Sequence, residues 1–475
     1  MSKLLWALIT CCSASSLSGN SWLLFPLYVI LWHPLPRTCP TVSGGALLHS
    51  AKFNLVATQL RTARLGRHCT LADALAVGVL WSHGYADDQS DECGLAHVLA
   101  TCRLARANRA VPDCLATGLQ VDADCALAFA VVGGGDGKRA EQFLTALLDE
   151  GSGELRDDDL ALITARAALA ADDAEFLYPG SVLLSHARRQ LGQGTAVAQP
   201  PFGVASDIAK LSPGRIRAAL REPVPVRVAA LGQFDAAFAE AVKALPLPGR
   251  ERNVRGAVGC IAGVELAAMQ ELEHDRVDSP YVSVAFAVPV GDERVAFALG
   301  VEIATARAFR RWRYRGFEQR ARAPFVAWSW MHADAVVQFC RRGENPRQLL
   351  PGERPEATAG DETTATRAEL EQLLEDLRTV PPSPQELEFS RAALRSRWRF
   401  AGPGEASPWA AEPAMYPGRL QVLLLATHHG VDVAKLDSVG PELVHAALKR
   451  VLQAKLASWH VLLPANSESY GYRGR

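Results

Sequence analysis

Imidazole and carboxylate side chains gather at residues 80–101, where they could supply ligands for a metal ion. An apolar run at 74–82 predicts a buried strand, a loop with four acidic residues follows, and residues 94–106 predict a helix. Imidazole nitrogens and carboxylate oxygens are common ligands of Zn²⁺. A zinc site built here would have a spacing that matches no known pattern, and its candidate ligands are His97, His83 and either Glu92 or Glu175.

The same stretch resembles the metal-binding segment of the pitrilysin/insulinase-type peptidases, where an acidic loop leads into a helix that opens with Gly-Leu-Ala-His, as at 94–97 here. In that family the helix carries His-x-x-Glu-His, whose two histidines share one helix face and bind Zn²⁺ while the Glu is the general base. His97 matches the first histidine, but Ala100 stands at the base and Thr101 at the second histidine. The family's third ligand, a Glu on a later helix, falls at Ala170 or its neighbour. The resemblance therefore implies a vestigial site with no catalytic residue.

Further segments follow the order found in that family, so that the resemblance covers about residues 47–465. A Pro-Phe-Gly turn at 201–203 precedes a Ser-Pro helix start, a strand and a closing helix. In the second half, Pro-Gln-Glu-Leu at 384–387 resembles the family's Thr-x-x-Glu-Leu helix. The segment at 323–327 resembles one that lies near the substrate, with Phe325 in place of a Tyr. Phe325 is thus either a substrate-binding residue that lacks the hydroxyl or an ordinary core aromatic.

Other sequences that could do chemistry fail on their spacing. The Gly-rich run at 133–138 lacks two positions of the Walker motif and predicts a strand-to-helix turn. The His-His-Gly sequence at 428–430 fits a helix C-terminus better than a metal site. Cys-x-x-Cys and Gly-x-Ser-x-Gly do not occur in the sequence. Five of the ten cysteines form one window and are expected to be buried thiols, with one or two disulfides if the chain is exported: Cys69, Cys93, Cys102, Cys114 and Cys125.

Strands and helices recur in a similar order on both sides of a segment rich in Pro, Gly and Arg, which indicates a duplicated α+β unit in this chain of 475 residues. With the resemblance, this predicts two similar domains, each a mainly antiparallel sheet covered by helices. Balanced charges, 50 basic against 51 acidic residues, argue against a nucleic-acid partner. The expected parts are an apolar leader at 1–45, a first domain at 46–247, a linker at 248–254 and a second domain at 255–475.

The N-terminal leader combines Lys3, a short apolar stretch and a Ser-rich run, an order typical of a secretory signal. A second apolar stretch contains Pro26, and each stretch is shorter than the ~18–20 residues of a membrane-spanning helix. These features favour export to the periplasm, or membrane association through residues 1–36, over a cytoplasmic location. An unstructured leader is the alternative.

Three functions follow from the resemblance. The first is a non-catalytic subunit that binds peptide, or completes the chamber of an active peptidase partner of the same family, with no cofactor. The second is an active zinc metalloendopeptidase with displaced ligands, and the third is a structural subunit of a larger membrane complex. The zinc content of the purified chain distinguishes the first two.

Overall fold

The structure is a computed structural model, and the account below is confined to the residues that it describes. The apolar leader, the linker predicted at 248–254 and the stretch to residue 268 lie outside that set. The described residues are 46–50, 55–59, 74–149, 155–176, 179–192, 195, 198–232, 234–245, 247, 269–274, 277, 279–288, 293–312, 325–327, 336–342, 359–398, 420–421, 423–425, 428 and 433–465.

Among the described residues, the first half of the chain forms a six-stranded sheet in which one pair, β2 with β6, is parallel and the other pairs are antiparallel. The central strands β3 and β5 are buried along their whole length, as their apolar sequences predict. The spatial order is β1 (Ala46–Ser50), β2 (Leu55–Gln59), β6 (Val226–Gly232), β3 (Leu75–Trp81), β5 (Ala126–Val132) and β4 (Ala116–Val121).

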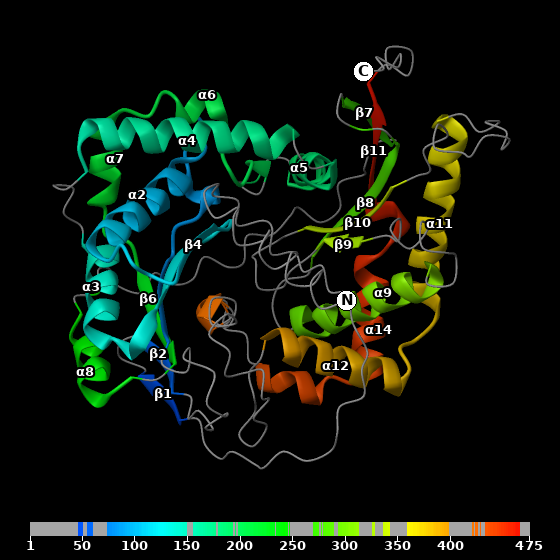
Figure 1. Cartoon of the computed structure of the whole chain (residues 1–475). Coiled ribbons are helices and arrows are strands. Elements are labelled where there is room, and N and C mark those ends of the chain that lie inside the picture. Colours follow the sequence, from blue (N-terminus) through cyan, green and yellow to red (C-terminus); the bar gives the residue numbers. More distant parts are fainter. Residues whose placement is uncertain are drawn as a thin grey trace, which may run out of the picture.

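Helices cover this sheet in two layers (Figure 1). Helices α2, α3 and α8 bury their apolar side chains against one face of the sheet. Helices α4, α6 and α7 pack outside α2 in a separate apolar cluster. The bounds are α2 (Leu95–Ala110), α3 (Gly137–Leu148), α4 (Asp157–Phe176), α5 (Pro179–Leu191), α6 (Ala205–Ile208), α7 (Pro213–Leu220) and α8 (Ala236–Ala244).

Within the described part of the second half, five strands form a sheet of the same kind, again with a single parallel pair, β7 with β11. Strands β9 and β10 pair antiparallel, with Phe325 opposite Cys340. The spatial order is β7 (Gln270–His274), β11 (Ser458–Pro464), β8 (Tyr281–Ala287), β10 (Val336–Arg342) and β9 (Phe325–Ala327).

One face of the second sheet packs on four helices through the apolar cluster that includes Phe286, Phe297 and Phe339. The last of these helices ends at Val451 and is followed by a short 3₁₀ turn at Ala454–Leu456. The four helices are α9 (Glu293–Trp312), α11 (Ala359–Thr379), α12 (Pro384–Trp398) and α14 (Pro441–Val451).

Each half also covers the free face of the other half's sheet. Helix α5 leaves the first half and packs Leu183 and Ala187 against the second sheet (Figure 1). In return, leucines at 420–425 of the second half pack against Leu80 and Leu127 of the first sheet. Burial on both faces explains why β3 and β5 read as unbroken apolar runs.

Candidate functional site

The acidic loop before α2 caps the N-terminus of that helix. The Asp88 side chain is fully buried, and its carboxylate accepts hydrogen bonds from the backbone N–H groups of Gly94 (2.8 Å) and Ala96 (2.9 Å). A carboxylate near the N-terminus of a helix also interacts favourably with the positive end of the helix dipole. Gly94 has φ of 108°, and a Cβ there would lie 2.6 Å from the Ile208 side chain, so only glycine fits at this start.

Glu92, a candidate ligand in the displaced zinc site, is held by a cation from α7. Arg215 donates to both of its carboxylate oxygens, from Nε at 2.6 Å and from Nη2 at 2.7 Å. The hydrogen bonds from Arg215 lower the pKa of Glu92, and its partial burial opposes this. A bidentate pair of this kind occupies the lone pairs that a metal ion would need.

His97 lies on α2 where the resemblance placed it, half-buried beside the 201–203 turn. Its ring meets Phe202 edge to face, with the ring centroids 5.5 Å apart. Burial disfavours the imidazolium form and lowers the pKa of His97 to about 4. A neutral imidazole in van der Waals contact with an aromatic ring can bind a metal ion, and it can equally be a packed histidine.

The two motif positions that follow His97 carry neither the general base nor the second histidine of the family. Ala100 is 0% exposed and packs among the side chains of the first sheet, including Val77 and Val79. The Thr101 hydroxyl donates a hydrogen bond to the His97 carbonyl oxygen at 2.8 Å, one turn back along the same helix. The general-base position is therefore part of the apolar core, and the second-ligand position is satisfied within α2.

Helix α4 runs against α2, as the resemblance requires of the helix that carries the third ligand. Ala170 is half-buried and its neighbour Ala171 packs in the cluster between the helices. Glu175 lies on the same helix, five residues beyond Ala170, and its side chain is outside the described set. Neither alanine has a donor atom that could reach a cation.

The displaced zinc site is not assembled by the side chains that the structure describes. His83 contacts the Asp88 carboxylate, with Nε2 3.8 Å from Oδ1, while Glu92 pairs with Arg215. Among the described residues, His83, Glu92 and His97 do not form a three-ligand group.

A three-ligand group does occur elsewhere in the described chain, between the two halves. One donor atom each of Asp124, Cys125 and His428 lies within 4.8 Å of the other two. The helix end predicted at 428–430 falls partly outside the described residues. His428 itself is 3% exposed and contacts Arg227 of β6. Its Nε2 is 3.3 Å from the Asp124 carboxylate, and its Nδ1 is 2.8 Å from Nη1 of Arg227.

The contact with Arg227 decides what this group can do. A guanidinium can only donate, so Nδ1 of His428 accepts and the ring proton lies on Nε2, facing Asp124. A cation bound at Nε2 would have to displace that proton. Burial, followed by the nearby Asp124 and Asp122 charges, also raises the pKa of the Cys125 thiol, which opposes formation of the thiolate ligand. The geometry favours an Arg–His–Asp cluster that joins the halves.

Two further observations concern predicted residues. Phe325 lies on β9, where its backbone pairs with Cys340, and its side chain is outside the described set. The described cysteines are free thiols, so no disulfide forms among them; Cys69 lies outside this set, and the free residues are Cys93, Cys102, Cys114, Cys125 and Cys340.

Helices in the described ranges are not long and apolar enough to cross a membrane.

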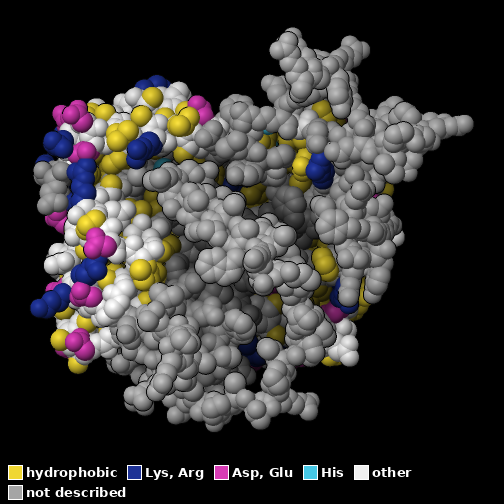
Figure 2. Space-filling view, in the orientation of Figure 1, with side chains coloured by type: hydrophobic (Ala, Val, Ile, Leu, Met, Phe, Trp, Pro, Cys, Tyr) yellow, Lys and Arg dark blue, Asp and Glu magenta, His cyan; other side chains and the backbone are white. Residues whose placement is uncertain are grey.

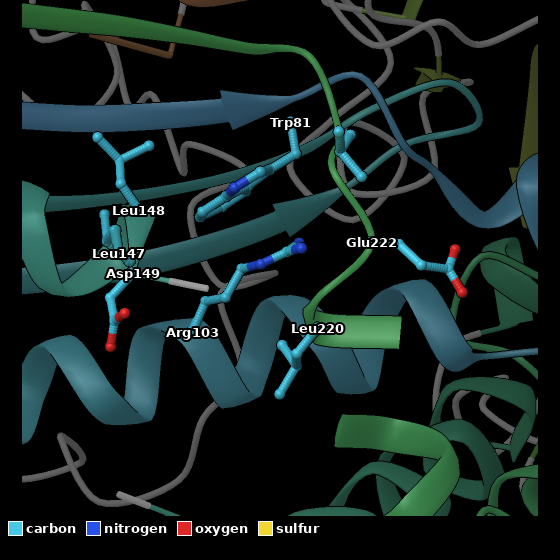
Figure 3. A pocket seen from close by; sticks show the side chains of 8 residues that line it. Trp81, Arg103, Leu147, Leu148, Asp149, Leu220 and Glu222 are labelled. Atoms are coloured by element: carbon cyan, nitrogen blue, oxygen red, sulfur yellow. The ribbon is translucent and has the colours of Figure 1, made fainter. Parts of the chain in front are cut away.

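A small recess lies beneath α2 (Figure 3). It offers about 10 Å³, room for one water molecule, and Arg103 lies over the Trp81 ring there, 4.8 Å from its centroid. Leu147 and Leu220 line it from α3 and α7. It is too small for a peptide side chain of any size.

The chain matches no protein-family model and no curated protein sequence. Its structure is similar to a protease from Helicobacter pylori, with 14% identity, a TM-score of 0.63 and coverage of 90% of this chain and 100% of that one. It is also similar to a peptidase M16 inactive domain from Pseudomonas fluorescens, with 14% identity, a TM-score of 0.59 and coverage of 89% and 98%.

A third similar structure is the periplasmic protease PqqL from Escherichia coli, with 11% identity and a TM-score of 0.57. That match covers 90% of this chain but 48% of the other, so this chain spans about half the length of that protease. At such low identities the likeness shows a shared fold. The expected α+β fold of the M16, or pitrilysin/insulinase-type, proteins is confirmed.

Proposed function

We propose that this chain is a non-catalytic member of the pitrilysin/insulinase-type peptidases that pairs with an active peptidase subunit of the same family. The packing of α2 is the observation that carries the proposal. Its base position, Ala100, faces the sheet core, and Thr101 bonds to its own helix. A zinc ion bound at His97 would have no second nitrogen ligand on this helix, and its bound water would have no carboxylate base there.

The fold supports a role in holding peptide. Among the described strands, β4 ends the first sheet without an outer neighbour, and Ala116 and Thr117 at its start are exposed. An open antiparallel edge of this kind can accept a peptide as an added strand. The near-neutral net charge of −1 fits recognition through backbone pairing and shape.

The similar structures include both a domain of this size and a longer protease that contains the same fold. The inactive domain from Pseudomonas fluorescens matches this chain over nearly its full length, whereas PqqL is about twice as long. We infer that the fold of this chain corresponds to one half of such a chamber and that the active peptidase subunit supplies the half with the intact motif. A location in the periplasm or at a membrane, and the absence of a cofactor, are parts of the same proposal.

Metal analysis tests the proposal. We expect less than ~0.1 zinc per chain in the purified protein. A complex with the partner should contain no more zinc than the partner contains alone. Stoichiometric zinc that is lost in both His97→Ala and His83→Ala would instead favour the metallopeptidase with displaced ligands, whose activity peptide cleavage would then establish. Co-purification of an M16 subunit with an intact motif supports pairing, and a monomer that binds no such subunit contradicts it.

A further inference from the structure

We propose that the outer face of α4 is a docking surface for a cationic amphipathic helix of a partner protein. The surface consists of Asp158, Leu162, Ala165, Leu169 and Asp172, all of which are exposed. We call these five residues the α4 stripe. It goes beyond the proposed function, because it lies on the side of α4 that faces away from α2 and the vestigial site.

The helical period places the α4 stripe on one narrow face. At 100° per residue its five members fall within an arc of about 80°, and they span about 21 Å along the axis. The opposite side of α4 is buried against α2, with Leu160, Ile163 and Ala167 in the cluster there. The stripe is therefore a second face of a helix whose first face is already packed.

Its apolar part is unusual for a solvent-facing helix. Leu162 is 50% exposed and Leu169 is 62% exposed, and both lie one turn from Ala165. Figure 2 shows hydrophobic side chains gathered at the upper left, over the position of α4. Two leucines that flank a small residue form a shallow hole into which a side chain of a second helix can insert.

Charge at the two ends selects the partner. Asp157 pairs with Arg217, and Asp159 pairs with Arg109, whereas Asp158 has no salt bridge within the described part of the chain. Asp172, at the other end of the stripe, likewise has none there. Two carboxylates that bracket an apolar stripe favour a partner with basic residues at both ends.

The same charges disfavour the other occupants. In an antiparallel pair of two copies, Asp158 of one chain would face Asp172 of the other, and in a parallel pair each Asp would face its own copy. Like charges in such positions are destabilising. An anionic membrane surface would be repelled for the same reason.

The test uses the full chain and a labelled synthetic helix as the probe. The probe carries leucines three and four residues apart, with two lysines at each end, and the control probe replaces these lysines with glutamates. Fluorescence anisotropy at low ionic strength measures binding. We expect the lysine probe to bind about three- to tenfold more tightly, because exposed ion pairs contribute only modestly to affinity.

Variants assign the binding to the α4 stripe. Leu162→Asp and Leu169→Asp are expected to abolish binding, while Leu443→Asp, which changes an equally exposed leucine on α14, leaves it unchanged. The double change Asp158→Lys and Asp172→Lys should reverse the preference between the probes. The proposal is overturned if both probes bind equally or if neither binds at millimolar concentration. It is also overturned if Leu443→Asp weakens probe binding as much as Leu169→Asp does, or if sedimentation shows that the wild type is a homodimer that Leu169→Asp dissociates.

Discussion

Placing a glutamate at Ala100 restores the general base of the family's motif and tests whether the site is closed by packing. Ala100 is 0% exposed and faces Val77 and Val79 of the first sheet. Burial at this position would keep the carboxyl group neutral at pH 7, which requires a pKa about 2.7 units above the ordinary value for Glu. Such a shift lowers the free energy of unfolding by about 4 kcal/mol. Overpacking adds about 1–3 kcal/mol. The total, about 5–7 kcal/mol, approaches the whole stability of many domains.

Urea denaturation followed by circular dichroism measures this cost. Ala165→Glu is the matched control, since it makes the same chemical change on the exposed face of a neighbouring helix and should alter the free energy of unfolding by less than about 0.5 kcal/mol. We expect Ala100→Glu to unfold at far lower urea, or to be insoluble. A soluble variant of near wild-type stability would refute the packing argument. Stoichiometric zinc and peptide cleavage after the further change Thr101→His would refute it more strongly.

Three other outcomes can be measured. Hydrogen bonds from Arg307 lower the pKa of Glu386 from 4.5 to about 2, so the pair stabilises the fold fully above pH ~5 and loses its effect as the pH falls toward 2. Glu386→Gln should therefore cost about 1–2 kcal/mol at pH 7, after discounting for solvent, and almost nothing near pH 2. His428→Phe should lower the free energy of unfolding by about 1–3 kcal/mol, because it removes a buried acceptor of an Arg227 hydrogen bond. Added zinc should not raise the melting temperature of the wild type, and a rise that this variant abolishes would identify a metal site. Cys102, whose pKa burial raises to about 12, should react with thiol reagents only after unfolding, and labelling in the native state would contradict its position.

Local patterns predicted much of the fold, because they rest on short-range chemistry. The apolar run at 74–82 became β3. Ser383 and Glu386 form a capping box at α12, a local motif with reciprocal hydrogen bonds of 3.0 and 3.2 Å. The Gly-rich run became a strand-to-helix turn whose Asp136 caps α3. The edge strand β4 gave no such signal, since it is half-exposed and contains Gly118.

The sequence by itself determined that α2 carries no general base, because no fold can supply a carboxylate at Ala100 or an imidazole at Thr101. Only the tertiary structure decided which polar residues are already engaged. Glu92 meets Arg215 from 123 positions away, and His428 reaches Arg227 across 201. Pairings over such separations depend on how both sheets and their covering segments pack together, and no local pattern encodes that packing.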